Sequence, residues 1–150
     1  MLRPATDSDF PALSTIVTAS EWWGTPGDRD DVLLGGNAFA IEVEGEIAGW
    51  LGVAEERDPE YRFAALDIVL APKHQDRGLG PEALRTVIDW LVSERGHHRF
   101  TIDPAVRNRR AIRAYEKVGF KPVGVMRRYE RGKDGSWHDN LLMDLLAEEL

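Results

Sequence analysis

The chain from Phe63 to Pro81 reads FAALDIVLAPKHQDRGLGP. Its first eight residues, up to Leu70, form an apolar run of the length and composition typical of a buried central strand. Pro72 opposes continuation of that strand. The spacing then becomes helical, with one apolar face made of Leu84, Val87, Ile88 and Leu91. The stretch therefore predicts a buried strand, a glycine-bearing loop and a helix that has Pro81 in its first turn.

The loop from Gln75 to Gly80 lies where the expected strand gives way to the expected helix. The first turn of a helix presents unpaired backbone N–H groups and a partial positive charge, which together favour an anion such as pyrophosphate. Gly78 and Gly80 carry no Cβ, so the backbone can approach a phosphate closely. Neither a GxxxxGK[ST] loop nor a GxGxxG fingerprint is present. The residues alone leave two interpretations open: an anion site and an ordinary strand-to-helix turn.

Towards the N-terminus, the pattern predicts two helices and three strands. The expected elements are a short strand near Leu2, a helix capped by Thr6 or Asp7 with Phe10, Leu13 and Ile16/Val17 on its core face, a break at Trp22 to Gly27, a short helix from Asp28 to Leu34, and strands at Ala38 to Val43 and Ile47 to Ala54. A tight hairpin, Glu44-Gly45-Glu46, joins these two strands. Together with the central stretch, this half of the chain alternates irregularly between strands and helices.

Towards the C-terminus, strands outnumber helices. The expected elements are a strand at Phe100 to Ile102, a helix capped by Asn108 that carries Ile112, Tyr115 and Val118 and ends at Gly119, and strands at about Pro122 to Glu130 and Trp137 to Leu145 joined by a turn at Gly132 to Gly135. The order is β-α-α-β-β-β-α-β-α-β-β. This order predicts an α/β (α+β) fold with a mixed central sheet flanked by helices, rather than a doubly wound parallel sheet.

Composition narrows the classes of function. The length of 150 residues fits one domain, residues 1–150. The chain has 19 Lys and Arg against 26 Asp and Glu, a net charge of −7. This surplus argues against a nucleic-acid partner and is compatible with a cationic substrate. No run approaches the roughly 18 apolar residues of a membrane helix, and the N-terminus lacks an apolar leader, so we expect a cytoplasmic protein with no membrane partner.

Metal and thiol chemistry are not expected. The chain has no cysteine, which excludes disulfides and thiolate ligands. The histidines His74, His97, His98 and His138 show no metal-ligand spacing, and we expect them to be solvated. Glu55 and Glu56 are expected to be exposed charges at a strand end.

Two segments together resemble the GNAT superfamily of acetyltransferases. Gln75-x-x-Gly78-x-Gly80 is similar to the family's acyl-CoA loop, Gln/Arg-x-x-Gly-x-Gly/Ala. The segment from Asn108 to Phe120, with Ala111, Tyr115 and Gly119, is similar to the family's Asn-x-x-Ala-x-x-x-Tyr-x-x-x-Gly-Phe. Neither motif is specific alone, but their separation and the order of elements around them agree with the family. The resemblance implies a single GNAT-like domain that uses acetyl-CoA as cosubstrate and needs no metal.

The resemblance also implies which residues hold the coenzyme. The loop amides bind the pyrophosphate, and the end of the preceding strand hydrogen-bonds the pantetheine arm and the acetyl carbonyl. The coenzyme residues implied in this way are Ile68, Val69, Leu70, Gln75, Asp76, Arg77, Gly78, Leu79, Gly80, Pro81, Asn108, Ala111 and Tyr115.

Two residues are candidates for the catalytic proton transfers. Asp67 interrupts an apolar strand, where an acidic residue is costly unless it is paired, so it is a candidate general base. The alternatives are a solvated strand face and a base that acts through a water chain. By resemblance, Tyr115 lies near the coenzyme sulfur as general acid. Its alternative role is core packing beside Ile112.

The acceptor is implied by a narrower resemblance. Glu21-Trp22-Trp23-Gly24, Ile102-Asp103-Pro104 and the Asn108 to Phe120 segment resemble bacterial aminoglycoside 6'-N-acetyltransferases, with Trp137-His138-Asp139 as a weaker match. The substrate-binding residues implied are Trp22, Trp23, Asp67, Asp103 and Asp139. The residues alone leave alternatives open: Asp103 either binds a second ammonium or caps its loop, and the tryptophan pair either packs over the core or lines the site.

The expected reaction is direct transfer of the acetyl group to a primary amine of a small polycation, most simply an aminoglycoside 6'-amine, in a ternary complex. Two other functions stay open: acetylation of protein N-termini or lysines, and a non-catalytic acyl-CoA-binding module. An edge strand near the C-terminus would also allow a homodimer.

Overall fold

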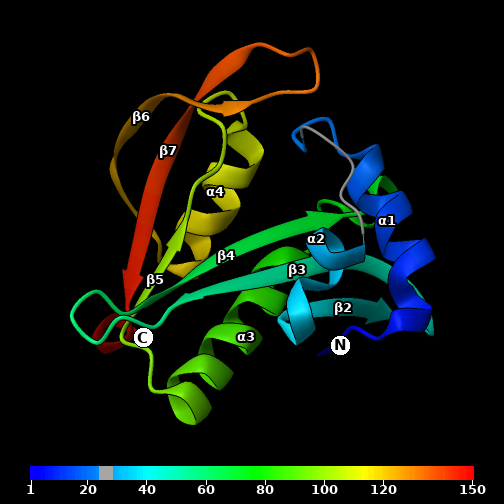
Figure 1. Ribbon diagram of the computed structural model, residues 1–150, viewed down its shortest axis with the longest axis horizontal. Coiled ribbons are helices and arrows are strands. Elements are labelled where there is room, and N and C mark those ends of the chain that lie inside the picture. The colour runs from blue at the N-terminus through cyan, green and yellow to red at the C-terminus, as the bar shows by residue number, and fades with distance from the viewer. Residues whose placement is uncertain (24–28) are drawn as a thin grey trace.

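The computed structural model describes residues 1–23 and 29–150. Its helices and strands, shown in Figure 1, are β1 (Leu2–Pro4), α1 (Phe10–Ala19), α2 (Arg29–Leu33), β2 (Ala38–Val43), β3 (Glu46–Glu56), β4 (Phe63–Leu70), α3 (Leu79–Arg95), β5 (Arg99–Ile102), α4 (Arg109–Val118), β6 (Lys121–Arg131) and β7 (Trp137–Leu146). The predicted order of elements is confirmed. The helix expected from Asp28 to Leu34 corresponds to α2 and a 3-10 turn at Leu34–Gly36 that follows it. Asp28 itself lies outside the described residues, as do residues 24–27 of the expected break.

The strands form one seven-stranded sheet in the order β1-β2-β3-β4-β5-β7-β6. Every neighbouring pair is antiparallel except β4 and β5, which are parallel. That parallel ladder contains only two residue pairs, Ala64 with Phe100 and Ala65 with Thr101. Beyond them the two strands diverge, as Figure 1 shows. In the described part of the chain, no strand pairs with the β5-facing edge of β4 after Ala65.

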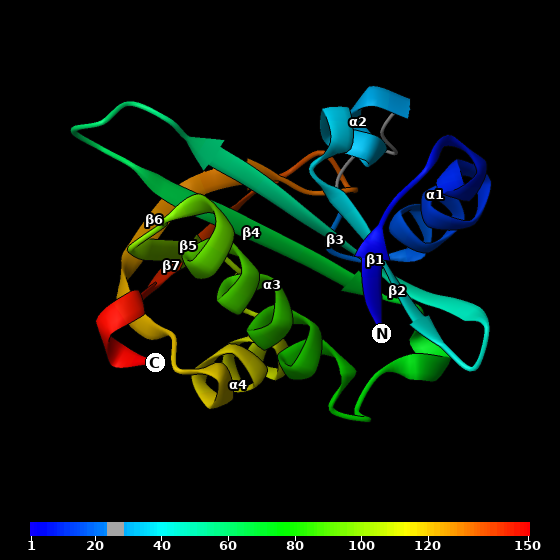
Figure 2. The ribbon, with the colours of Figure 1, turned by 90° about the horizontal axis from the view of Figure 1, so that it is seen from below.

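Helices cover both faces of the sheet. Figure 2 shows α3 and α4 side by side on one face and α1 and α2 on the other. Successive side chains of a strand point to opposite faces, so β2 and β3 contribute to two cores. Leu51 and Val53 of β3 pack with the apolar face of α3, whereas Trp50 packs with Leu13 and Val17 of α1. The predicted apolar stripe of α3 is confirmed, because all four of its residues are buried.

Glu55 corrects one expectation. It is not an exposed strand-end charge, because β3 extends two residues past the predicted end at Ala54 and its side chain is only 5% exposed. Glu55 Oε1 accepts a hydrogen bond from the guanidinium of Arg95 at 2.7 Å, and Oε2 lies 3.2 Å from Nε2 of His97. His97 is buried as well, so the expectation that it is solvated is also wrong. His97 and Glu55 are 42 residues apart in the chain, so local sequence patterns could not predict their contact.

The other histidines were also expected to be solvated, and His138 is not, because its side chain is only 13% exposed. His74 is buried, with its Nδ1 3.2 Å from an Arg77 guanidinium nitrogen, so the solvated interpretation is wrong for it too. His98 and Glu56 are exposed, as expected. No helix in the described ranges has both the length and the apolarity needed to cross a bilayer.

Glu55→Ala is expected to lower the free energy of unfolding by about 2–3 kcal/mol, because it leaves the Arg95 charge and the buried His97 without their partner. Urea unfolding followed by circular dichroism measures this change. Glu56→Ala, at the exposed neighbouring position, is the matched control and should stay within about 0.5 kcal/mol of wild type. Equal effects of the two variants would contradict a structural role for the Glu55 cluster.

Candidate active site

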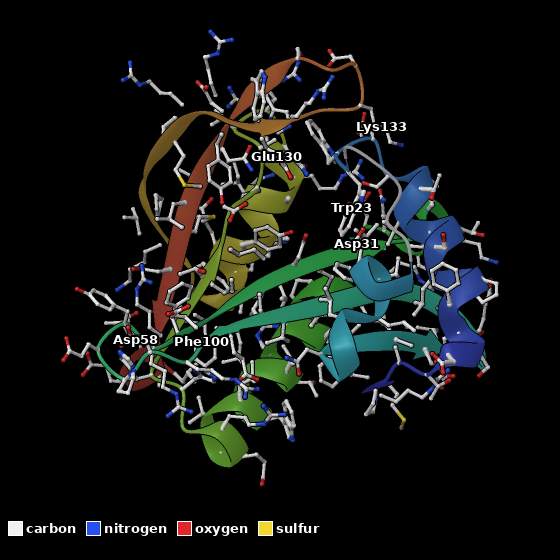
Figure 3. The ribbon with its side chains drawn as sticks, in the orientation of Figure 1. Trp23, Asp31, Asp58, Phe100, Glu130 and Lys133 are labelled. Carbon is white, nitrogen blue, oxygen red and sulfur yellow. The ribbon has the colours of Figure 1, made fainter. Side chains whose placement is uncertain are left out.

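A cavity of about 410 Å³ lies beside the divergence of β4 and β5. Its lining comes from the α1–α2 segment, three neighbouring strands, the segment after β5, and α4: Trp23, Asp31, Leu34, Trp50, Gly52, Ala54, Ala65, Leu66, Asp67, Ile102, Asp103, Pro104 and Tyr115. Four residues predicted for the site from the sequence, namely Trp23, Asp67, Asp103 and Tyr115, therefore face one space. Figure 3 shows Trp23 and Asp31 on one side of this region and Glu130 on the other.

Asp67 places a carboxylate inside the cavity from the middle of β4. The residue is exposed, because its side chain opens into the cavity. Desolvation by the surrounding protein atoms, with the negative charges of Asp103 and Glu130, raises the pKa of Asp67 to about 7. The backbone N–H of Ile68 donates to Asp67 Oδ1 at 2.9 Å, which opposes the rise. A carboxyl group that titrates near neutral pH is suited to accept a proton from an ammonium and to release it again.

Tyr115 reaches the same cavity from α4. The residue is 9% exposed, and its ring packs edge-on against Phe120. Burial and the charges of Asp67 and Asp103 raise the pKa of the Tyr115 hydroxyl well above its usual range. The phenol therefore stays protonated at neutral pH and can donate a hydrogen bond or a proton. Packing and a donor role are compatible in this geometry.

The aromatic wall of the cavity comes from Trp23 and Trp50. Their rings meet edge to face, with centroids 5.0 Å apart, and the indole N–H of Trp50 donates to the carbonyl of Val32 at 2.7 Å. The sequence predicted Trp50 only as a residue of a strand, and nothing in its pattern assigned it to the site. In the structure it belongs to the second core and also lines the cavity. Trp22 does not line the cavity, and its backbone N–H donates to Ser20 Oγ.

The segment after β4 forms a loop whose backbone is shaped for an anion. Asp76 and Gly78 have positive φ angles of 61° and 79°, and Gly78 is the N-cap of the 17-residue helix α3. A Cβ added at Gly78 would meet nothing within 4 Å, so the space above these amides is open. Backbone of this kind at a helix N-terminus fits a pyrophosphate. The loop therefore fits the expected coenzyme.

Side chains of α4 and of the loop hold this conformation. Gln75 Nε2 donates to the carbonyl of Leu70 at 3.2 Å, and its Oε1 accepts from Arg110 of α4. Arg110 also lies 3.5 Å from Asp76 Oδ1. Asn108 is the N-cap of α4, where its Oδ1 accepts from the backbone N–H of Ala111. Arg110 lies in the Asn108 to Phe120 segment, but the sequence did not predict its contacts with Gln75 and Asp76. These contacts form because α4 packs against α3.

Asp103, directly after β5, is held by Asn140 of β7. The amide Nδ2 of Asn140 donates to the Asp103 carbonyl at 2.8 Å and lies 3.3 Å from Asp103 Oδ1. Burial raises the pKa of Asp103, and the charge of Glu130 raises it further. The hydrogen bond from Asn140 opposes this rise.

Asp139 does not join the cavity. It is exposed, and its Oδ1 accepts from the backbone N–H of Arg128. Glu130 and Asn140 were missed by the sequence analysis. The pairing of β5 with β7 brings Asn140 to Asp103, and the pairing of β6 with β7 adds Glu130.

The family follows from comparison with known proteins. A model of the acetyltransferase (GNAT) family matches residues 4–120, more than half of the chain. The chain belongs to this family. The match includes the loop, β4 and α4, so the positions assigned by resemblance lie inside the GNAT region.

Individual relatives of this GNAT protein differ in acceptor. Aminoglycoside N(6')-acetyltransferase type 1 of Klebsiella pneumoniae is 37% identical over 92 residues, which are 61% of this chain and 44% of that protein. Spermidine N(1)-acetyltransferase of Escherichia coli is 28% identical over 88 residues, 59% of this chain and 47% of that protein. The chain thus spans less than half the length of these curated relatives. A solved ribosomal-protein-alanine N-acetyltransferase from Brucella melitensis has a TM-score of 0.82 at 25% identity and covers 97% of this chain and 99% of its own.

Proposed function

We propose that this protein transfers the acetyl group of acetyl-CoA directly to a primary amine of a small polycation, with an aminoglycoside 6'-amine as the leading candidate. The observation that carries the proposal is the single cavity lined by Asp67, Asp103 and Tyr115. It lies beside the free edge of the strand that leads into the anion-binding loop. One amine and one acyl donor could therefore meet at the divergence of β4 and β5.

The chain's own residues suit the proton transfers of this reaction. Acetyl-CoA supplies the thioester that is attacked. Asp67, with its pKa near 7, accepts a proton from the incoming ammonium, and Tyr115 donates a proton to the departing thiolate. Main-chain N–H groups on the edge of β4 that lies free of a partner strand after Ala65 would stabilise the oxyanion that develops on the acetyl carbonyl. Holding both substrates together lowers the barrier further.

Tyr115→Phe is expected to lower kcat about tenfold and to leave KM for the amine within about twofold, because the phenol acts on the leaving group rather than on the bound acceptor. Stability should change little, since the ring keeps its contact with Phe120. Steady-state kinetics at saturating acetyl-CoA measures the effect. Full turnover in the phenylalanine variant would remove the hydroxyl from the mechanism and leave Tyr115 a packing role.

A cationic acceptor is supported by the charge of the cavity. Asp67, Asp103 and Asp31 all line it, and a site rich in carboxylates concentrates ammonium groups. The two relatives named for aminoglycosides and spermidine both act, by their names, on amines. Trp23 would wall the acceptor, and we retain Asp67 and Asp103 as its ligands. Trp22 and Asp139 are not retained.

A panel of kanamycin-type aminoglycosides, spermidine and alanine-terminated peptides, each assayed for free CoA release from acetyl-CoA, tests the proposal. Turnover with a polyamine and none with peptides is the expected result. Peptide acetylation is the second candidate, because the Brucella melitensis structure matches nearly the whole chain. Coenzyme binding without turnover of any acceptor would favour a non-catalytic acyl-CoA-binding module.

Two further expectations remain predictions. β6 lies at the open edge of the sheet, where it could pair with β6 of a second copy to form a homodimer. We also expect a cytoplasmic location, because the proposed reaction uses acetyl-CoA from that compartment.

A further inference from the structure

One buried histidine lies directly before the loop from Gln75 to Gly80 and has no part in the proposed reaction. His74 ends the 3-10 turn Pro72–His74 between β4 and that loop. Its Nδ1 lies 3.2 Å from a guanidinium nitrogen of Arg77, which belongs to the loop. Its Nε2 is buried and has no hydrogen-bond partner among the described residues. A buried imidazole with one partner on the loop and one unsatisfied nitrogen calls for an explanation.

The contact with Arg77 determines the state of the His74 ring. A guanidinium only donates hydrogen bonds, so Nδ1 accepts and carries no proton. The ring hydrogen is therefore on Nε2, and the imidazole is neutral. Nε2 lies 3.8 Å from Oε2 of Glu46, the first residue of β3. This distance is too long for a hydrogen bond, but the carboxylate charge still favours the tautomer with its proton on Nε2.

Lys73 keeps the Glu46 carboxylate ionised. Its ammonium pairs with Oε1 of Glu46, and this hydrogen bond lowers the pKa of the carboxyl group. Glu46 thus presents a negative charge to the Nε2 side of His74 at neutral pH. Because the proton stays on that side, the lone pair of Nδ1 stays directed at the guanidinium of Arg77.

A neutral partner leaves the charge of Arg77 uncompensated. In the described part of the chain, no carboxylate forms an ion pair with Arg77, and the neighbouring Asp76 pairs with Arg110 instead. Arg77 is exposed and lies between Asp76 and Gly78, which both have positive φ angles. A guanidinium held by an imidazole keeps its full positive charge, which a carboxylate partner would offset. The charge is therefore available to an anion on the loop.

We propose that His74 is a positioning residue for the coenzyme, whose neutral ring holds the charged guanidinium of Arg77 where the pyrophosphate of acetyl-CoA meets the loop. This inference rests on the proposed function, which has acetyl-CoA as the acyl donor. Arg77 binds the phosphate, and His74 acts through Arg77 without touching the coenzyme. Glu46 and Lys73 maintain the tautomer of His74 that this role requires.

The test is a double-mutant cycle on the Kd for acetyl-CoA, measured by calorimetry. Arg77→Met removes the charge and is expected to raise Kd about tenfold. His74→Leu removes the Nδ1 acceptor and should raise Kd about fivefold. His74→Asn has nearly the same shape as His74→Leu but offers an acceptor oxygen, so its Kd should stay within about twofold of wild type. In the Arg77→Met background, neither His74 variant should have a further effect.

Three further measurements separate this role from packing and from general charge. Arg57→Met removes the same charge from an exposed position directly after β3 and is the matched control, which should keep the wild-type Kd. Dephospho-CoA keeps the pyrophosphate but lacks the 3'-phosphate, so the same losses are expected with it. His74→Phe keeps an aromatic ring without an acceptor and should match His74→Leu, which provides a second variant if the leucine substitution prevents folding.

The outcomes separate the positioning role from the reaction. Equal effects of His74→Leu and His74→Asn overturn the role, because the ring would then matter only for packing. Losses that add fully in the double variant overturn it as well, as do losses that disappear with dephospho-CoA or that Arg57→Met reproduces. Turnover is measured on the same samples. The expected affinities without acetyl transfer to any amine reject the proposed function and leave the positioning role standing, whereas acetyl transfer with unchanged affinities rejects the positioning role alone.

Discussion

Asp67→Asn is expected to lower kcat/KM for the amine acceptor about 10²–10³-fold, the size of effect usual for loss of a general base. The amide keeps the shape of the carboxylate but cannot accept the proton of an ammonium. In wild type, kcat/KM should rise with pH through about pH 7 as Asp67 ionises. The variant should lose that rise. Initial rates between pH 5.5 and 9 at saturating acetyl-CoA measure both effects.

The same substitution is expected to stabilise the protein above neutral pH. The pKa of Asp67 is raised on folding from 3.8 to about 7, so the folded chain binds more protons than the unfolded chain between these values. Wild-type stability therefore falls as pH rises through this window, and the loss is complete above pH 7. Asp67→Asn avoids this loss and should be more stable by ~1 kcal/mol at pH 8. The full shift would give more, but the carboxylate is open to the cavity and partly screened.

Asp89→Asn is the matched control for both measurements, since it removes the same charge from an exposed position on α3. Its kinetics and its stability should follow wild type across the pH range. An Asp67 variant that is inactive but not stabilised at pH 8 would still support the base and would contradict the raised pKa. An active Asp67 variant would point to a base that acts through water.

Gly78→Ala is expected to weaken acetyl-CoA binding about 10²-fold. Its added Cβ meets no protein atom, so any loss of affinity comes from the space that the coenzyme needs and from the φ of 79° that alanine resists. Displacing a pyrophosphate from a set of backbone N–H groups removes charge-assisted hydrogen bonds of about 1.5–3 kcal/mol each, so losing one or two accounts for the effect. Calorimetric titration with acetyl-CoA measures the change.

Two glycines give matched controls for the Gly78 variant. Gly45 lies in the β2–β3 turn with a φ of 76° and equally open surroundings, so Gly45→Ala should cost similar stability, about 1 kcal/mol, without changing coenzyme affinity. At Gly80 a Cβ would make an ordinary contact at 3.6 Å with Leu70, so Gly80→Ala tests bulk in the loop without a positive φ. If Gly78→Ala bound acetyl-CoA as tightly as Gly45→Ala does, the loop would not be the pyrophosphate site.

Hydrophobic spacing was sufficient to predict the order of the secondary structure. Strand β4 has the predicted bounds, and α3 buries the predicted stripe, because burial of one face is imposed by local period alone. The two-residue turn between β2 and β3 was equally local, with positive φ at both Glu44 and Gly45. These features depend on neighbours within one or two turns of chain.

Features that depend on distant partners were not predictable. In the local sequence Glu55 has the pattern of a surface charge, because its partners are distant in the chain: Arg95 ends α3 and His97 lies between α3 and β5. Glu130 gave no signal, since a bulge changes which side chains face a neighbour and the sequence of β6 carries no mark of where the extra residues lie. For Asp67 the signal existed, a single acid in an apolar strand. Its raised pKa comes first from desolvation in the fold and then from the charges of Asp103 and Glu130, none of which the local sequence shows.

The short ladder between β4 and β5 has a consequence for thermodynamics. One edge of β4 is joined to β3 over its whole length, while the other edge pairs with β5 at only two positions. A pantetheine arm bound along the unpaired edge would act as an eighth, non-protein strand between the two halves of the sheet. The cohesion of those halves would then depend on the concentration of a metabolite, and saturation with acetyl-CoA would raise the melting temperature by mass action.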